Sequence, residues 1–111
     1  MDEAQAKRVL GLVGLGVRGR LAIVGVDRVR EAVKGGKVYV AIVAADASPN
    51  SRQKIDGLLA GREVPTLYVG TADALGQAVG RDATTVIGVV DRNLADGILA
   101  IATPANADRQ S

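Results

Sequence analysis

Apolar residues along the chain follow two alternating spacings. Apolar positions three or four residues apart predict five helices, which begin near residues 2, 26, 49, 72 and 92. Between them, short apolar runs predict four strands, at residues 21–24, 38–44, 66–69 and 84–90. Helices and strands therefore alternate along the chain. This alternation predicts an α/β fold, namely a three-layer α/β/α sandwich with the sheet in the middle.

Residues with capping preferences stand at several of the expected helix ends. The pair Ser48-Pro49 supplies a hydroxyl N-cap followed by proline at the first helical position. Thr71 and Asp91 are expected to cap the fourth and fifth helices, and Gly35-Gly36 to end the second. The run 38–44 is almost entirely apolar, which is typical of a strand covered on both faces. We therefore expect it at the centre of the sheet.

Three glycines, Gly11, Gly14 and Gly16, suggest the glycine-rich fingerprint of dinucleotide-binding proteins. That fingerprint lies between a strand and a helix, whereas these glycines lie inside a helical pattern. No Walker-type lysine accompanies them. We interpret the glycines as positions where a helix packs closely against its neighbours.

The length of 111 residues suits one ordinary domain, and the composition is that of a folded protein, with 48% hydrophobic and 23% charged residues. We expect residues 1–102 to form this domain. Residues 103–111 carry a proline and small polar side chains, so we expect a flexible C-terminal tail there. The sequence predicts neither a signal peptide nor a membrane span, and we expect a cytoplasmic protein with no membrane partner.

The chain has no cysteine and no histidine. This excludes disulfide scaffolds, thiol catalysis and most transition-metal sites, and it removes the commonest general base. The aspartates are scattered among expected caps and loops rather than clustered. We therefore predict a protein that is not an enzyme and that holds no metal and no cofactor. The aromatic residues are Tyr39 and Tyr68 alone, which disfavours an aromatic platform for single-stranded nucleic acid.

The net charge is only +2, but the charges are distributed unevenly along the sequence. A basic strip between residues 18 and 37 holds Asp27, Glu31 and six basic residues, which are Arg18, Arg20, Arg28, Arg30, Lys34 and Lys37. Gly25 lies within the strip where a predicted strand becomes a helix, so the first helical amides are expected to point outward with partial positive charge. The strip predicts a surface for phosphate groups, and the alternative is an ordinary solvated helix face.

Short motifs also follow one another in a recognisable order. They are Val9-Leu10-Gly11-Leu12, Gly35-Gly36-Lys37, Ala44 to Ser51, Val64-Pro65, Val69-Gly70-Thr71, Leu75-Gly76, Val79-Gly80 and Val86 to Asp91. In this order, across residues 7–102, the chain resembles the kink-turn RNA-binding ribosomal proteins of the L7Ae type, and most closely their bacterial YlxQ-like branch. The resemblance implies an α/β/α sandwich around a four-stranded mixed sheet that binds structured RNA at one end.

The resemblance also implies which residues bind the RNA. In the family, a Gly-x-Asn-Glu-x-x-Lys motif at the start of the second helix recognises the sheared G·A pairs of a kink-turn. Here Gly25 is kept, while Asp27, Arg28 and Glu31 stand where the family has Asn, Glu and Lys. A second contact, an apolar loop against an extruded nucleotide, corresponds to the segment after the last strand. The RNA-binding residues expected from this resemblance and the basic strip are Arg18, Arg20, Gly25, Val26, Asp27, Arg28, Glu31, Lys34, Lys37, Val89, Val90, Asp91 and Arg92.

The expected function is therefore non-enzymatic binding of structured RNA, kink-turn-like or ribosomal, in the translation apparatus. The alternative is a protein-interaction module that keeps the fold while its RNA-recognising residues have diverged. The excess of positive charge in the strip favours RNA, whereas Asp27 and Glu31 within the strip favour the alternative.

Overall fold

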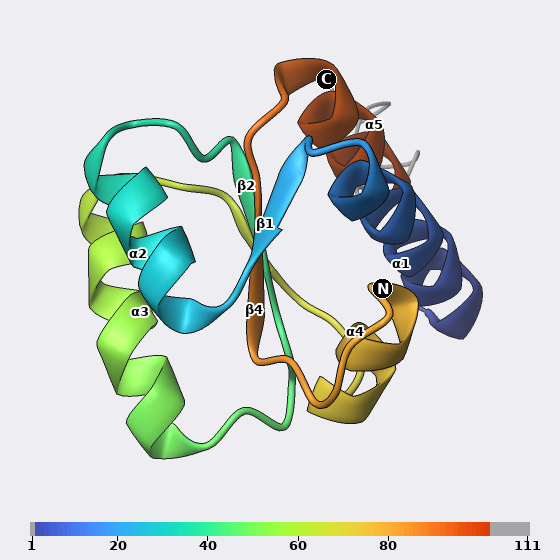
Figure 1. The fold of residues 1–111 in the computed structure, drawn as a ribbon, viewed down its shortest axis with the longest axis horizontal. Coiled ribbons are helices and arrows are strands. Elements are labelled where there is room, and N and C mark those ends of the chain that lie inside the picture. Colours follow the sequence, from blue (N-terminus) through green and yellow to red (C-terminus); the bar gives the residue numbers. More distant parts are fainter. Residues whose placement is uncertain (1, 103–111) are drawn as a thin grey trace, which may run out of the picture.

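A computed structural model describes residues 2–102, and the tail predicted at 103–111 lies outside the described residues. Within residues 2–102 the chain forms five helices and four strands in the alternating order that the sequence predicts (Figure 1). The helices are α1 (Glu3–Arg18), α2 (Val26–Lys34), α3 (Pro49–Gly61), α4 (Ala72–Ala78) and α5 (Arg92–Ala102). The strands are β1 (Ala22–Val24), β2 (Val40–Val43), β3 (Thr66–Tyr68) and β4 (Val86–Val89).

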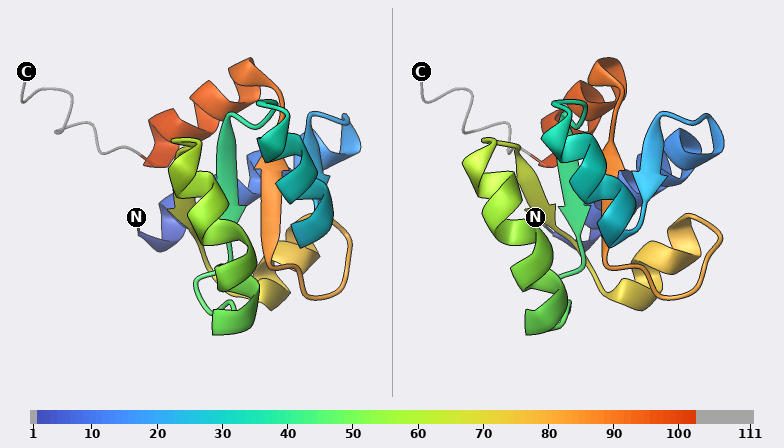
Figure 2. Two further views of the ribbon diagram at one scale, coloured as in Figure 1. Left: turned by 90° about the vertical axis from the view of Figure 1, so that its left-hand side faces the viewer. Right: turned by 60° about the vertical axis from the view of Figure 1, so that its left-hand side comes forward.

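The four strands form one mixed sheet in the order β1-β4-β2-β3. β4 is antiparallel to both of its neighbours, β1 and β2, whereas β2 and β3 are parallel. Helices α2 and α3 cover one face of the sheet, and α1, α4 and α5 cover the other (Figures 1 and 2). The expected three-layer α/β/α sandwich around a four-stranded mixed sheet is confirmed.

Strand β2 lies inside the sheet and is covered on both faces, as its apolar run predicts. All four of its residues are buried. Val40 and Ile42 belong to the core beneath α1, α4 and α5, while Ala41 and Val43 belong to the core beneath α2 and α3. Because both faces exclude water, no position along this strand is left for a polar side chain.

The expected helix caps form. Ser48 Oγ accepts from the N–H of Ser51 (3.2 Å) at the start of α3, and Thr71 Oγ1 accepts from Ala74 (3.0 Å) at the start of α4. Asp91 Oδ2 accepts from the N–H of Leu94 (2.8 Å) at the start of α5. These bonds satisfy amides that have no partner within the helix, which is why such residues end the preceding segments.

The last strand is shorter than the predicted run 84–90. Thr84 donates its N–H to Ala72 O of α4 (2.9 Å) instead of to a neighbouring strand, and the strand begins only at Val86. The β-branched residues before it therefore belong to a loop. This loop, residues 80–85, connects α4 to β4.

The glycines of α1 pack against neighbouring helices, as interpreted from the sequence. A Cβ atom at Gly14 would overlap the carbonyl oxygen of Ala78 at the end of α4, and one at Gly16 would overlap the side chain of Leu94 on α5. Gly11 has nothing within 4 Å of its Cβ position and takes no part in this packing. Two of the three glycines thus let α1 approach the other helices closely.

The mixed topology gives the sheet two chemically different ends. At one end, called the Gly25 end, strands β1, β2 and β3 finish and β4 starts. This end lies at the bottom of Figure 1. It comprises segments 25–28, 44–52, 70–73 and 80–85. The opposite end is the Tyr39 end, which comprises segments 18–21, 34–39, 62–65 and 90–93.

Candidate nucleic-acid interface

The start of α2 is uncapped. Gly25 holds a φ of 109°, a backbone conformation that side-chain-bearing residues rarely adopt, and its carbonyl oxygen accepts from the N–H of Val29 (3.0 Å). No side chain caps the first amides of the helix. These amides therefore present partial positive charge to whatever lies beyond the Gly25 end. This agrees with the expectation for the strand-to-helix junction.

The segment that faces Gly25 is the loop between α4 and β4. A cleft of about 550 Å³ is lined by Val24, Gly25 and Val26 on one side and by residues 81–85 on the other. Its two walls meet because antiparallel pairing places the end of β1 beside the start of β4. We call it the Gly25 cleft. Arg81 joins the candidate site in this way, although the sequence analysis did not single it out.

Three arginines from separate segments converge beside this cleft. Arg20, Arg28 and Arg81 line an adjoining cleft of about 430 Å³ along the edge strand β1. Arg20 has a φ of 62°, in the left-handed region, because the chain turns sharply between α1 and β1. The ion pairs found within residues 2–102 involve other side chains, so these three guanidinium groups keep their donors for a ligand. Forked donors of this kind match phosphate groups.

A groove of about 510 Å³ runs along α2 from the Gly25 end to the Tyr39 end. Its floor includes Ile23 and Ala32, and its charged walls are formed by Asp27, Arg28, Glu31 and Lys37. Glu31 lies midway and forms an ion pair with Lys34 (3.8 Å), in which both side chains are largely exposed. The structure thus brings the divergent motif residues together on one surface, as the sequence predicts.

The expected second contact does not join that surface. Val89, Val90, Asp91 and Arg92 were expected to share one RNA site with the start of α2, and this placement is wrong. Because β1 and β4 are antiparallel, the end of β4 lies beside the start of β1, at the Tyr39 end. Val89 is also fully buried, and Asp91 is engaged in capping α5.

The basic strip is likewise divided. Helix α2 carries the chain back along the sheet, so Arg28 lies at the Gly25 end while Lys34 and Lys37 lie at the other. Arg18 is also at the Tyr39 end, since it precedes the start of β1. Arg30 is partly buried on α2, and its Nε has no hydrogen-bond partner among the described residues. The strip is continuous in sequence but not in space.

The two ends consequently differ in charge. The segments of the Tyr39 end hold two acidic residues, Glu63 and Asp91, and six basic ones. The basic residues are Arg18, Arg20, Lys34, Lys37, Arg62 and Arg92. The segments of the Gly25 end hold three basic and four acidic residues, which are Arg28, Arg52 and Arg81 and Asp27, Asp46, Asp73 and Asp82. Positive charge at the Gly25 end thus comes from Arg28 and Arg81, which line its clefts, and from Arg52, which lies over the ring of Tyr68.

Over residues 2–102, no three histidine, cysteine, aspartate or glutamate side chains gather where they could hold a metal ion. None of the helices in this part of the chain combines the length and the hydropathy needed to cross a membrane.

Comparison with known proteins identifies the family. The model of the ribosomal protein L7Ae/L30e/S12e/Gadd45 family matches residues 8–98. Two relatives, each called RNA-binding protein YlxQ, are 27% identical to this chain. The match to the Bacillus subtilis protein covers 81% of this chain and 90% of that protein. The match to the Enterococcus faecium protein covers 86% of this chain and 91% of that protein.

Solved structures show the same fold. A Bacillus halodurans protein of unknown function has a TM-score of 0.78 and 31% identity over 84% of this chain and 94% of its own. The Giardia lamblia 15.5kD RNA binding protein has a TM-score of 0.79 and 24% identity over 90% of this chain and 88% of its own. The expected resemblance is confirmed, and the chain belongs to the ribosomal protein L7Ae/L30e/S12e/Gadd45 family.

Proposed function

We propose that this protein binds structured RNA at the Gly25 end of its sheet, without catalysing a reaction. The observation that carries the proposal is the convergence of Arg28 and Arg81 beside the uncapped start of α2, with Arg20 lining the same cleft from the turn before β1. Guanidinium groups and free helix amides both bind phosphate oxygens, and together they recognise a folded backbone by its shape. The names of the two YlxQ relatives support the same assignment.

A kink-turn or a ribosomal RNA with similar geometry is the ligand we propose, bound in the cytoplasm as part of translation. Gly25 has nothing within 4 Å of its Cβ position, so an RNA backbone can approach closely there. The Asp27 carboxylate accepts hydrogen bonds from guanine N–H groups, and Arg28 donates to guanine or to phosphate. These two residues supply the polar contacts that the family obtains from Asn and Glu.

A protein-interaction module is the second candidate, and one observation favours it. Acidic residues outnumber basic ones in the segments of the Gly25 end, and Glu31 lies on the groove beside it. A protein partner with basic side chains would complement such a surface. The two candidates differ in their response to RNA at low salt.

Salt dependence tests the RNA assignment. We expect the affinity for a kink-turn RNA to fall as salt rises, and Arg28→Ala and Arg81→Ala each to reduce the slope of log K against log salt by about 0.7–0.9, the value of one phosphate contact. Lys54→Ala, an exposed lysine on α3 outside these clefts, is the matched control and should leave the slope unchanged. Filter binding or calorimetry across a salt series measures the slope. If the wild-type protein binds no RNA at low salt, the protein-interaction module is the better account.

The divergent motif allows a separate test of kink-turn specificity. Glu31→Lys restores the charge that the family has at this position and adds a donor to the groove along α2. We expect it to strengthen kink-turn binding on the order of tenfold at low salt, and to strengthen binding to a plain RNA duplex much less. Asp96→Lys, an exposed position on α5, adds the same charge elsewhere and serves as the control. An equal gain on every RNA would show only that positive charge was added.

A further inference from the structure

Exposed apolar side chains lie at the Tyr39 end of the sheet. The N–H of Tyr39 donates to Val89 O (2.8 Å), and the N–H of Val90 donates to Leu21 O (2.8 Å). Leu21 continues the β1–β4 ladder opposite Val90, whereas Tyr39 lies beside Val89, the residue that is paired with Val40. Leu21 and Val90, which are paired, direct their side chains to the same face, and Val90 packs against the core beneath α2 and α3. Tyr39 is 44% exposed and Leu21 is 39% exposed, so both apolar side chains reach the surface at this end of the sheet.

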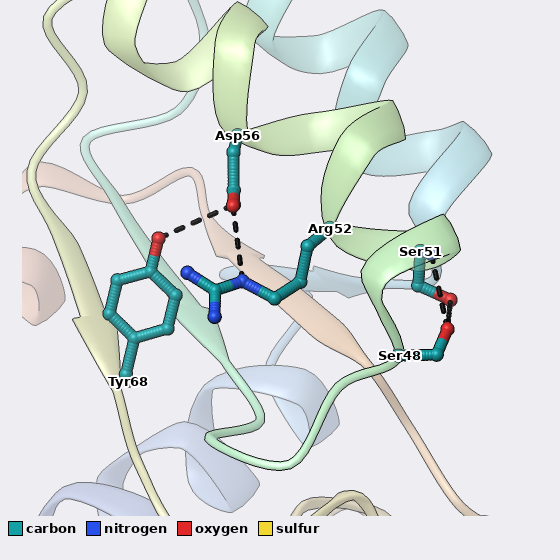
Figure 3. A network of polar contacts seen from close by, with 5 residues as sticks. All are labelled: Ser48, Ser51, Arg52, Asp56 and Tyr68. Atoms are coloured by element: carbon teal, nitrogen blue, oxygen red, sulfur yellow. Dashed lines mark hydrogen bonds and ion pairs between the residues drawn. The ribbon is translucent and has the colours of Figure 1, made fainter.

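Tyr68 is also 44% exposed, but its ring is already engaged. The guanidinium carbon of Arg52 lies 4.7 Å from the ring centroid, and the Tyr68 hydroxyl donates to Asp56 Oδ1 (3.3 Å). Asp56 Oδ2 accepts from Arg52 Nε (3.1 Å), which completes the network in Figure 3. Hydrogen bonding to Tyr68 and Asp56 raises the pKa of Arg52, so its charge stays in place over the ring. Within residues 2–102, neither a stacked cation nor a side-chain hydrogen bond engages Tyr39 in this way.

The free ring lies among the cations of the Tyr39 end. Lys37 stands two residues before Tyr39, and Arg92 stands two residues after Val90. The groove along α2 connects Lys37 with Arg28 at the Gly25 end, so it forms a continuous path between the two ends of the sheet. A flexible polyanion that leaves the Gly25 cleft would follow this path toward the more positive end of the molecule.

We propose that the Tyr39 end is a second RNA-contacting surface, which takes an unpaired segment extending from the structured RNA. One base stacks on Tyr39, and the neighbouring phosphates contact Lys37 and Arg92. Stacking on an exposed aromatic ring with flanking cations is the usual way in which proteins hold unpaired nucleotides. A single tyrosine accommodates a single base, which agrees with a chain that has too few aromatic residues for an extended platform. This inference rests on the proposed function.

Tyrosine emission tests the proposal directly, because the chain has two tyrosines and no tryptophan. Tyr68→Phe leaves Tyr39 as the sole tyrosine, and Tyr39→Phe leaves Tyr68. Each variant is titrated with a kink-turn RNA that carries a single-stranded 3′ extension, while anisotropy of a label on the RNA reports binding independently. We expect the extended RNA to quench the emission of Tyr39 and to leave that of Tyr68 unchanged.

Affinities give a second readout. Tyr39→Ala should weaken binding of the extended RNA about tenfold, the effect of one base–aromatic stack, and should leave binding of the same RNA without its extension unchanged. Arg28→Ala should weaken binding of both RNAs alike, because it lies at the Gly25 end. Tyr68→Phe is the matched control and should bind both RNAs as the wild type does.

The outcomes separate this inference from the proposed function. If Tyr39 emission stays constant while anisotropy shows saturation with extended RNA, the second surface is overturned and the Gly25 site stands. If the wild-type protein binds neither RNA at low salt, the proposed function fails and this inference fails with it. Quenching of Tyr39 by polyglutamate but not by RNA would assign the surface to an acidic protein partner, which also overturns the proposal.

Discussion

Val40→Asp is expected to unfold the protein at 25 °C. Val40 has no exposed surface and lies on β2 in the middle of the sheet, where its neighbours are apolar residues of the core beneath α1, α4 and α5. An unpaired carboxylate there costs several kcal/mol or forces its own protonation, and the total stability of a domain is only about 5–15 kcal/mol. Far-ultraviolet circular dichroism should show the loss of a cooperative thermal transition.

Two further variants make this result interpretable. Val40→Ala removes two carbon atoms without adding charge, so it should lower the free energy of unfolding by about 2–3 kcal/mol while the fold is retained. Lys54→Asp makes a larger change of charge at an exposed position on α3 and should leave the melting temperature close to that of the wild type. A Val40→Asp protein that melts like its parent would show that β2 is not the buried central strand.

Gly76→Ala is expected to destabilise the protein and to weaken RNA binding at the same time. Gly76 is buried in α4, and a Cβ atom there would overlap the carbonyl oxygen of Asp82 and lie 2.9 Å from that of Arg81. These are backbone atoms of the loop that lines the Gly25 cleft, so they cannot move aside as a flexible side chain would. Overpacking of this kind costs about 1–3 kcal/mol, and relief requires the loop to shift.

The matched control for this variant is another helical glycine. Gly57 on α3 is exposed and has nothing within 4 Å of its Cβ position, so Gly57→Ala should stabilise the protein by about 0.5–1 kcal/mol through helix propensity alone. Urea unfolding compares the two variants, and RNA affinity is measured where both are folded. Equal stability of the two variants would mean that loop 80–85 does not close on α4.

The local pattern of the sequence was sufficient to predict the layers of the fold. Helical and strand spacings identified, in order, the nine elements found in residues 2–102, and the caps at Ser48, Thr71 and Asp91 formed as expected. The central position of β2 also followed from its own composition. Such predictions succeed because the burial of one helix face or of both strand faces depends on residues that are near one another in the chain. The capping of a helix start is local in the same way.

Contacts between distant segments could not be predicted in the same way. Asp46 is one of the aspartates that the sequence places among expected caps and loops, yet its Oδ1 accepts from the N–H of Ala72 at the start of α4, 26 residues away (2.8 Å). The alternation of hydrophobic positions along a strand indicates which face of that strand is buried, but it does not indicate which other strand lies beside it. The proximity of loop 80–85 to Gly25 therefore depends on the pairing of β1 with β4, which the hydrophobic pattern does not predict.

The sequence by itself determined the fold class, the family, the uncapped start of α2 and the set of charged residues available. Only the tertiary structure decided how those residues combine. Antiparallel pairing of β1 and β4 brings Arg81 to Gly25 and moves the segment from Val89 to Arg92 to the opposite end. Helix α2 spans the sheet from one end to the other, so a basic strip that is continuous in sequence is divided between two surfaces. The order of charges along a chain is a property of the sequence, whereas the electrostatic field that a ligand meets depends on which segments the fold brings together.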